Sequence, residues 1–419
     1  MKIPVSKNSL FEFPSLPRNL LLDIQKAAKK ADITNVAIVG GLVRDQLLIN
    51  AEESSLYNSK DLDLLVEGSA TQLAIALRNE LDPKRISNLR IHASYNTVEM
   101  KIDGVPIDLA TARLERYELP GENPKVTPCI LEKDLFRRDF TINAMAIELS
   151  AMKLIDPHDG ESALAKRELH FLHSRSVEDD PSRIIRAARY SARLLFHLAP
   201  DSLNQVKSTL KRWPWHWRQG NSTHLAPPAL ATRLRQELEL LLFQEPWEKA
   251  LSNLQSWEGL LLLDRGLQSD QDWKRRLRWA SKLKVNLLTA LLVGAENPKA
   301  LAERLQLPKQ QQDLIIQSLQ IQKSFLELNG SKEYLSWSPS RWSHEIETAK
   351  WNQEAVALSI CKGGPIWRPL FRWWSRWRLI KSPISAKELI SKGWIPGESL
   401  GQELQRLRRE RLDRNKKSR

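Results

Sequence analysis

Two aspartates separated by one residue are the first candidates for chemistry. The segment DLDLLV, residues 61–66, places Asp61 and Asp63 two positions apart among leucines. In a β-strand, residues i and i+2 point to the same face, so the two carboxylates would lie side by side. Like charges this close favour a cation between them, and Mg²⁺ takes such oxygen ligands together with substrate phosphates. The segment predicts a metal site; the alternative is an exposed strand with two solvated acids.

A glycine pair after an apolar run is the second candidate. Residues 36–39 are apolar, Gly40 and Gly41 follow, and Arg44 comes three positions later. Glycines let backbone N–H groups approach a phosphate, and a helix beginning there adds a favourable dipole. Arg44 could bind a phosphate oxygen. The alternative is an ordinary strand-to-helix turn in which Arg44 pairs with Asp45.

Two arginines and an aspartate in an otherwise apolar segment form the third candidate. Arg137, Arg138 and Asp139 open the sequence RRDFTINAMA. The arginines could hold a triphosphate, and Asp139 could accept a hydrogen bond from a ribose hydroxyl. Alternatively, Asp139 or Thr141 caps a helix and Asn143 satisfies nearby backbone groups.

The fourth candidate is the start of a predicted helix, DDPSRIIRAARYSAR, residues 179–193. Asp180 followed by proline is typical of an N-cap and a first helical residue. An aspartate and Arg183 at the head of this helix could offer an acceptor and donors to a base edge. A stripe of arginines behind them could meet phosphates, and it comprises Arg186, Arg189 and Arg193. The alternatives are that Asp180 only caps the helix and that the stripe is a solvated face.

The elements that must position these residues change character along the chain. Runs rich in β-branched and leucine residues predict strands at 35–39, 61–66, 96–102 and 105–109, and a helix at 71–81. From Pro181 onward the pattern is helical, with apolar residues at 3.6-residue spacing in 230–243 and 286–293. Breaks are expected at 213–217, 221–228 and 244–246, and all fifteen tryptophans lie beyond residue 212. We therefore expect an α+β head with a mixed sheet, followed by an all-α remainder.

Composition narrows the class of protein. The chain has 419 residues, of which 42% are hydrophobic and 27% charged, as in folded globular proteins. Its net charge of +14 favours a polyanionic partner, although a basic protein without a specific partner would look the same. Cys129 and Cys361 form no CxxC pair, which argues against a disulfide scaffold or a cysteine-rich zinc site. This cysteine usage fits a reducing cytoplasm, and since no apolar run reaches the roughly 20 residues of a membrane span, we expect no membrane contact.

Taken together and in this order, the motifs resemble one family. GGLVRD, DLDLLVEG, RRDFTINAMA, DPHDG (156–160) and DDPSRIIRAAR occur in one sequence. They are similar to the class II tRNA nucleotidyltransferase/poly(A) polymerase family, which comprises the CCA-adding enzymes and their CC-adding and A-adding relatives. The resemblance is closest over 36–196 and looser at 227–243. It implies a catalytic nucleotidyltransferase head at 1–155, a helical neck that selects the base at 156–245, and a helical body and tail that bind tRNA at 246–419.

The resemblance also implies roles for individual residues. Asp61 and Asp63 would bind two Mg²⁺ ions, which activate the RNA 3′-hydroxyl to attack the α-phosphate of ATP or CTP, with release of pyrophosphate. Asp108 is a possible third acid that we do not count as a ligand. The triphosphate would be held by Gly40, Gly41 and Arg44.

The remaining implied contacts concern ribose and base. Arg137, Arg138 and Asp139 would contact phosphate and the ribose 2′-hydroxyl. Asp180 and Arg183 would hydrogen-bond the incoming base in place of a nucleic-acid template, supported by Arg186 and Arg189. From the residues alone, a C-terminal arginine cluster is a candidate for RNA-backbone contacts, a solvated tail being equally simple; it comprises Arg406, Arg408, Arg409 and Arg411.

Two departures from the family pattern bear on base selection. The pair before the template arginine is Asp179-Asp180, where the family usually has Glu-Asp, and Ser182 stands where an apolar residue is usual. The segment 113–128, rich in proline and charge, lies where the family has a flexible loop that helps the switch from C to A addition. The choice between CTP and ATP therefore stays open.

The predicted function is template-independent addition of C, A or both to the 3′ end of tRNA. The predicted partners are the tRNA acceptor end and a nucleoside triphosphate, and no protein partner is inferred. Three rivals remain: a poly(A) polymerase acting on other RNAs, a non-enzymatic RNA-binding protein that retains the fold, and a nucleotidyltransferase for a small acceptor.

Overall fold

The computed structural model describes residues 13, 16–17, 19–52, 61–211, 228–327 and 333–414. The predicted breaks at 213–217 and 221–227, and the last five residues of the basic C-terminus, lie outside the described residues. The chain divides into two compact units, the first reaching Gly259 and the second beginning at Leu260. The head and neck segments thus share the first unit, and the boundaries at 155 and 245 stay a prediction.

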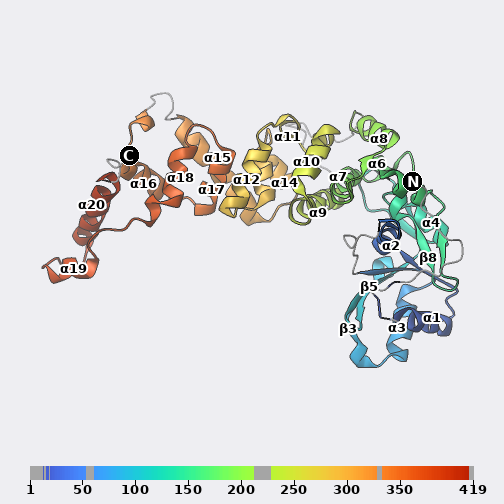
Figure 1. The fold of residues 1–419 in the computed structure, drawn as a ribbon. Coiled ribbons are helices and arrows are strands. Elements are labelled where there is room, and N and C mark those ends of the chain that lie inside the picture. The colour runs from blue at the N-terminus through green and yellow to red at the C-terminus, as the bar shows by residue number, and fades with distance from the viewer. Residues whose placement is uncertain are drawn as a thin grey trace. The chain divides into compact units, whose positions relative to one another are not determined.

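A seven-stranded sheet forms the centre of the first unit (Figure 1), in the order β3-β4-β5-β2-β1-β8-β9. β2 and β5 are parallel and the other neighbours are antiparallel, so the sheet is mixed. Its strands are β1 Asn35–Val39, β2 Leu62–Glu67, β3 Ile86–His92, β4 Thr97–Ile102, β5 Val105–Thr111, β8 Ala146–Glu148 and β9 Lys153–Ile155. Two small sheets pair β6 Arg113–Arg116 with β7 Lys125–Pro128, and β10 Glu168–Leu169 with β11 His197–Leu198. The predicted α+β head is confirmed.

The central strands are those that the sequence predicted. β1 has four successive buried residues, and β2 buries four of its six, as expected of strands covered on both faces. β4 and β5 form a hairpin whose turn contains Gly104 in a left-handed conformation, φ +81°. β3, β8 and β9 were not predicted: β3 is an edge strand with mostly exposed residues, and β8 and β9 have three residues each.

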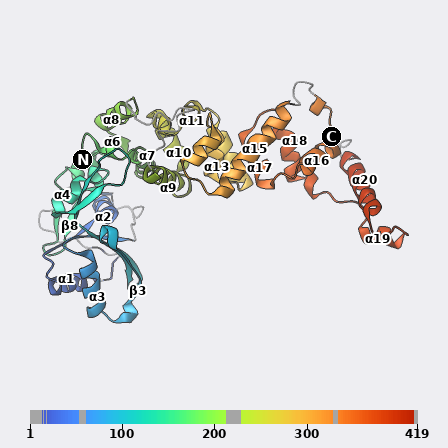
Figure 2. The same cartoon turned by 180° about the vertical axis from the view of Figure 1, so that it is seen from behind.

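Ten α-helices complete the described part of the first unit. α1 and α3 pack side by side against the sheet (Figures 1 and 2), and α7 packs against both α9 and α10. The helices are α1 Leu20–Lys30, α2 Gly41–Glu52, α3 Ala70–Glu80, α4 Leu131–Phe136, α5 Gly160–Lys166, α6 Ser176–Asp179, α7 Ser182–Leu194, α8 Pro200–Lys211, α9 Pro228–Gln244 and α10 Trp247–Ser256. α3 and α9 agree with the predicted helices at 71–81 and 230–243.

The second unit is helical throughout its described residues. Its helix α17, with seven of ten residues buried, packs against α12, α15 and α18. The helices are α11 Arg265–Ser269, α12 Trp273–Leu283, α13 Leu287–Leu292, α14 Pro298–Arg304, α15 Lys309–Glu327, α16 Pro339–Thr348, α17 Gln353–Lys362, α18 Trp367–Ser375, α19 Ala386–Ser391 and α20 Glu398–Arg414. Several tryptophans serve as core here: Trp342 stacks near Phe325 and Trp337, with ring centroids 5.0 Å apart in each case.

The positive charge is unevenly distributed along the chain. Residues 260–419 contain 30 Lys and Arg against 16 Asp and Glu, an excess of 14 that equals the net charge of the whole chain. Residues 1–259 are therefore neutral overall. Among the described helices, none has the length and apolar character needed to cross a membrane.

Candidate active site

Three carboxylates gather where β2 and β5 run side by side. Asp63 on β2 is the register partner of Asp108 on β5, and Asp61 is exposed immediately before β2. Burial, the charge of Asp108 and that of Asp61 raise the pKa of Asp63 to about 6, while Arg138 opposes the shift. Burial and the charges of Glu99 and Asp61 also raise the pKa of Asp108. Burial and mutual repulsion thus disfavour the charged form of both carboxylates, and a bound cation would offset this cost.

The chain provides few metal ligands of its own here. Within the described ranges, no group of three His, Cys, Asp or Glu side chains is arranged to hold a metal ion. The donor set is hard carboxylate oxygen, which suits Mg²⁺, an ion that usually keeps waters and substrate phosphates as its other ligands. The residues present therefore fit a cation that is completed by a nucleotide.

The glycine pair brings the β1–α2 turn against these acids. Gly40 has φ +76°, and a Cβ added to it would lie 2.9 Å from Asp63 Oδ2. Only glycine combines this backbone conformation with this close approach. Gly40 and Gly41 both line the cavity described below.

Arg44 already has partners within the protein. Its guanidinium is buried and donates to Asp45 Oδ1 from Nε and Nη2, at 2.8 and 2.7 Å, and to Asn143 Oδ1 from Nη1, at 2.8 Å. It does not line the cavity. The arrangement is the alternative stated for this motif, an arginine paired with its neighbouring aspartate.

The two arginines of the RRD motif lie on the cavity wall. Arg137 donates to the carbonyl oxygen of Arg113 at 3.1 Å and pairs with Glu115 and Asp134, both at 2.8 Å. Arg138 Nη2 pairs with Asp134 at 3.2 Å, and its buried Nε has no hydrogen-bond partner among the described residues. A buried donor without an acceptor is costly, so Arg138 is suited to an anionic ligand.

Asp139 faces the α7 helix rather than only capping its own segment. It accepts from the backbone N–H of Phe140 at 2.8 Å, from Asn143 Nδ2 at 3.0 Å, and from Arg186 Nε. Burial alone would raise the pKa of Asp139, but Arg186 and Asn143 hold it below its usual value. Asp139 is therefore a charged group that links the RRD motif to α7 through Arg186.

Asp180 and Arg183 lie at the start of α7 and line the same cavity. Asp180 Oδ1 accepts from the backbone N–H of Ser182 at 3.1 Å, but the N-cap of α7 is Pro181, one residue later than predicted. Arg183 is 6% exposed, and its Nη2 donates to the carbonyl oxygen of Arg137 at 2.6 Å. The head of α7 is thus fixed against the RRD motif.

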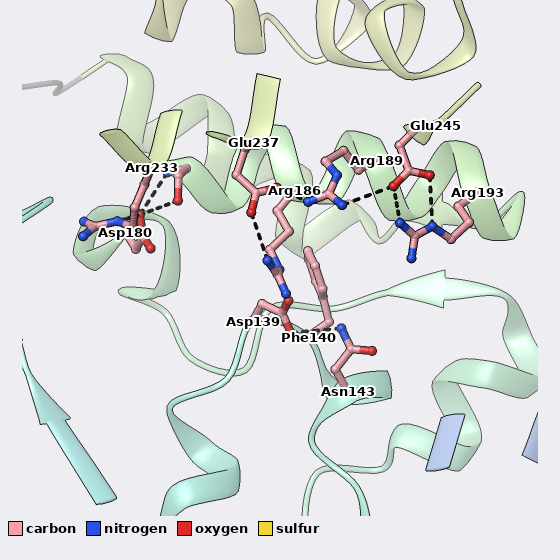
Figure 3. A network of polar contacts seen from close by, with 11 residues as sticks. Asp139, Phe140, Asn143, Asp180, Arg186, Arg189, Arg193, Arg233, Glu237 and Glu245 are labelled. Atoms are coloured by element: carbon pink, nitrogen blue, oxygen red, sulfur yellow. Dashed lines mark hydrogen bonds and ion pairs between the residues drawn. The ribbon is translucent and has the colours of Figure 1, made fainter. Parts of the chain in front are cut away.

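The arginine stripe of α7 is paired with acids and is not a purely solvated face. It pairs with two glutamates of α9 and its C-terminal end (Figure 3). Glu237 contacts Arg186 at 2.9 Å and also Arg189, and Glu245 contacts Arg189 at 3.3 Å and Arg193 Nε at 2.9 Å. We call this chain of pairs, from Asp139 through Arg186, Glu237, Arg189 and Glu245 to Arg193, the ion ladder. Arg189 is buried within it and does not line the cavity, whereas Arg186 does.

One cavity of about 420 Å³ collects most of the predicted residues. This volume lies within the range of about 300–1,000 Å³ that is usual for small-molecule sites. It is lined by Gly40, Gly41, Asp63, Glu115, Tyr117, Arg137, Arg138, Asp139, Asn143, Asp180, Ser182, Arg183, Arg186, Tyr190, Arg233, Gln236 and Glu237. The wall combines Asp63 of β2 and four acids from other segments with arginines from the RRD motif, α7 and α9, which suits a nucleoside triphosphate bound with a cation.

Several lining residues were not predicted from the sequence. Arg233, Gln236 and Glu237 come from α9, and Tyr117 comes from the segment between β6 and β7. Arg233 donates to Gly121 O at 2.7 Å and to Asp180 Oδ1 at 3.3 Å. The only available signal was the looser family match at 227–243, which gives no contacts.

The predicted RNA-binding arginines lie on α20 in the second unit. Arg406 pairs with Glu403 at 2.7 Å and with Glu410, and Arg408 pairs with Glu347 at 2.6 Å. Arg411 donates to the carbonyl oxygen of Lys381 at 3.2 Å, and Arg409 is exposed. Arg408 therefore holds α20 to α16, whereas Arg409 and Arg411 reach the surface.

Comparisons with known proteins bear on the family of the chain. Residues 36–170 match the family model described as the poly A polymerase head domain. The CC-adding tRNA nucleotidyltransferase of Deinococcus radiodurans is 35% identical over 296 residues, 68% of this chain and 71% of the relative. The A-adding tRNA nucleotidyltransferase of Aquifex aeolicus is 28% identical over 399 residues, 90% of this chain but 45% of the longer relative.

A solved structure shares the fold over nearly the full chain. The Thermotoga maritima CCA-adding enzyme complexed with tRNA is 23% identical, with a TM-score of 0.67, covering 96% of this chain and 93% of the other. At this identity the likeness concerns the fold, that is, the mixed sheet followed by helices.

Proposed function

The chain belongs to the class II tRNA nucleotidyltransferase family, and we propose that it adds C, A or both to the 3′ end of tRNA. The observation that carries the proposal is the single cavity lined by Asp63, the RRD motif, Asp180 and Arg183. The cavity thus brings together Asp63 and Arg183, which are 120 positions apart in the sequence. The curated relatives named CC-adding and A-adding support the acceptor and the reaction.

The chemistry is assigned to the acids of β2. Asp61 and Asp63 would hold Mg²⁺, two ions in our proposal, whose charge favours ionisation of the RNA 3′-hydroxyl and stabilises the pyrophosphate leaving group. The raised pKa of Asp63 supports this role, because a bound cation stabilises the charged carboxylate that burial and the neighbouring acids disfavour. Gly40 and Gly41 leave room for the phosphates beside Asp63.

The nucleotide is held by arginines that already line the cavity. Arg138, with its unpartnered buried Nε, would donate to a phosphate oxygen, and Arg137 would add a second positive charge. Asp139 would be positioned by Arg186 to accept from a ribose hydroxyl. Arg44 supports this site only indirectly, by holding Asn143, which in turn donates to Asp139.

The base is read by Asp180 and Arg183. A carboxylate accepts from an exocyclic amino group, which cytosine and adenine carry and uracil lacks. Arg183 would donate to a ring acceptor, and it is held for this by the carbonyl of Arg137. Arg189 acts through the ion ladder, by fixing α7, and does not touch the nucleotide.

The tRNA is assigned to residues 260–419, because they carry the entire net positive charge of the chain. Arg409 and Arg411 are the members of the α20 cluster best placed for phosphate contacts. In this proposal, the head at 1–155 performs the chemistry, the neck at 156–245 selects the base, and the body and tail at 246–419 hold the RNA.

Single-nucleotide extension tests the proposal. Three tRNA transcripts, ending before CCA, after the first C and after CC, are incubated with Mg²⁺ and one labelled nucleotide at a time. Two C additions that stop identify a CC-adding enzyme, A on the CC-ended transcript alone identifies an A-adding enzyme, and both identify a complete CCA enzyme. Long tails on unrelated RNAs would favour a poly(A) polymerase, and no incorporation by a folded, RNA-binding protein would contradict the proposal.

A further inference from the structure

The hydroxyl of Ser182 makes a contact that the assigned base-reading pair does not account for. Ser182 Oγ donates to Asp180 Oδ1 at 2.7 Å, and the backbone N–H of Ser182 donates to the same oxygen at 3.1 Å. Ser182 is 4% exposed and lines the cavity. An apolar residue at this position would keep the backbone contact and lose the shorter one.

A second group reaches the same oxygen from another element. Arg233 Nε on α9 lies 3.3 Å from Asp180 Oδ1, and Figure 3 shows these two side chains pointing toward each other. Arg233 also donates to the carbonyl oxygen of Gly121, whose N–H donates to the carbonyl oxygen of Asp179 at 3.0 Å. Within the described part of the chain, every side-chain contact of the Asp180 carboxylate thus falls on Oδ1.

The two donors constrain the carboxylate in different ways. Ser182 is fixed in the first turn of α7, so its hydroxyl defines one orientation of Asp180. Arg233 alone approaches from α9 at a longer distance, and a guanidinium can follow a carboxylate that rotates. Without the hydroxyl, Asp180 would keep a partner but lose its fixed orientation.

From these contacts we infer that Ser182 is a specificity-determining positioning residue, which holds Asp180 Oδ1 so that Oδ2 is presented to the amino group of the incoming base. The inference rests on the proposed function and deepens it. A preoriented acceptor rewards a base with a donor and penalises one that presents a carbonyl, because two acceptors then face each other. Selectivity between nucleotides should therefore depend on the hydroxyl more than does binding of the RNA.

The test uses an isosteric pair of variants in the full-length protein. Ser182→Thr keeps the hydroxyl, and Ser182→Val has the shape of the threonine side chain with a methyl group in place of that hydroxyl. Ser182→Ala removes the hydroxyl without added bulk. Ser191→Ala is the matched control, because Ser191 lies on the same helix and its buried hydroxyl donates to the carbonyl oxygen of Phe196 at 2.6 Å, away from the cavity. Melting temperatures of all four variants show whether each is folded.

Two readouts separate this inference from the proposed function. The first is kcat/KM for CTP and ATP relative to UTP in tRNA extension; the second is the Kd of each nucleotide with Mg²⁺ but without tRNA. We expect Ser182→Val and Ser182→Ala to lower the preference over UTP about tenfold in both readouts, measured for whichever of CTP and ATP the wild type uses better. The change should arise mainly through KM, and tRNA affinity should be unchanged. The preference of Ser182→Thr and of the Ser191→Ala control should stay within about twofold of the wild-type value.

The outcomes are distinct. Equal selectivity of Ser182→Val and Ser182→Thr would overturn the role of Ser182 while leaving the proposed function intact. Wild-type selectivity of Ser182→Ala would do the same. Failure of the wild-type protein to extend any tRNA would overturn the proposed function, and the nucleotide Kd ratios would still decide the role of Ser182. If Ser182→Val fails to fold, the selectivity of Ser182→Ala compared with that of Ser191→Ala decides the role of Ser182.

Discussion

Asp63 is mostly buried, and its two neighbouring carboxylates leave it poorly suited to stabilise the fold when it is charged. Its pKa of about 6, against a usual value of 3.8, means that folding binds protons in this pH range. For a carboxyl whose pKa is raised in the folded state, stability falls as the pH rises from about 4 to 6 and stays lower above it. The residue assigned to chemistry is thus maintained at some cost to stability.

Replacing this carboxylate should therefore stabilise the metal-free protein while abolishing turnover. We expect Asp63→Asn to raise the free energy of unfolding at pH 7.5 by about 1–2 kcal/mol, after allowance for partial solvent screening, with little difference near pH 4. Thermal unfolding in chelator across this pH range measures it. Asp61→Asn, at an exposed position, is the control and should change stability by less than about 0.5 kcal/mol. A destabilised Asp63→Asn protein at pH 7.5 would contradict the assignment.

Gly40 and Gly104 form a second matched comparison at single residues. Both have left-handed backbones, φ +76° and +81°, but a Cβ at Gly40 meets Asp63 Oδ2 at 2.9 Å and one at Gly104 meets nothing within 4 Å. Alanine at either position should cost about 1 kcal/mol of backbone strain. Only Gly40→Ala should also reduce nucleotide incorporation, by about 100-fold, because it displaces Asp63. Equal activity of the two variants would show that the close approach has no functional role.

At the scale of elements, the contact between α7 and α9 depends on charges in the interior. Glu237 is 8% exposed and is the only residue of the ion ladder that joins Arg186 to Arg189. Buried pairs add modest net stability, but removing one partner leaves the other charges uncompensated. This explains how a helix with Arg183, Arg186 and Arg189 can pack its arginine side inward.

Neutralising Glu237 should show whether this buried glutamate stabilises the fold more than a glutamate in a surface ion pair. We expect Glu237→Gln to lower the free energy of unfolding by about 3 kcal/mol, because Arg186 and Arg189 lose their shared counter-charge. Glu239→Gln, on the same helix with a 40% exposed side chain 4.0 Å from Arg235, should cost less than about 0.5 kcal/mol. Urea denaturation of both variants provides the measurement. Similar losses for both would mean that the ladder contributes no more than a surface pair.

At the scale of the whole molecule, charge and chemistry are assigned to different parts of the sequence. Residues 1–259 are neutral overall and contain the cavity, whereas residues 260–419 hold the excess of 14 positive charges. Each phosphate contact made by a Lys or Arg adds about 0.9 to the slope of log Kd against log salt on a duplex. The salt dependence of tRNA binding should therefore report on the second unit.

The corresponding prediction compares two pairs of exposed cations. Arg409→Gln with Arg411→Gln, both exposed on α20, should weaken tRNA binding several-fold in 0.1 M salt and lower the slope by up to about 2. Lys29→Gln with Arg78→Gln, exposed on α1 and α3, is the charge-matched control and should leave both quantities nearly unchanged. Titration of labelled tRNA at several salt concentrations distinguishes the pairs, and equal effects would contradict the assignment of phosphate contacts to α20.

The sequence by itself determined the fold class, the position of the central strands and the place where α7 begins. These are local properties: β-branched and leucine runs predict β1 and β2, and Asp180-Pro181 marks the start of α7. The ordered motifs also identified the family, which the comparisons confirm. The roles of the individual site residues remain predictions.

Only the tertiary structure decided which partner each charged side chain takes. Arg44 and Arg183 look equally available in the sequence, yet Arg44 is enclosed by Asp45 and Asn143 while Arg183 lines the cavity. Arg233 approaches Asp180 across 53 positions of sequence, and Glu237 reaches Arg189 across 48. Pairing over such separations depends on how helices pack, because a buried charge must find a counter-charge and no local spacing specifies which one.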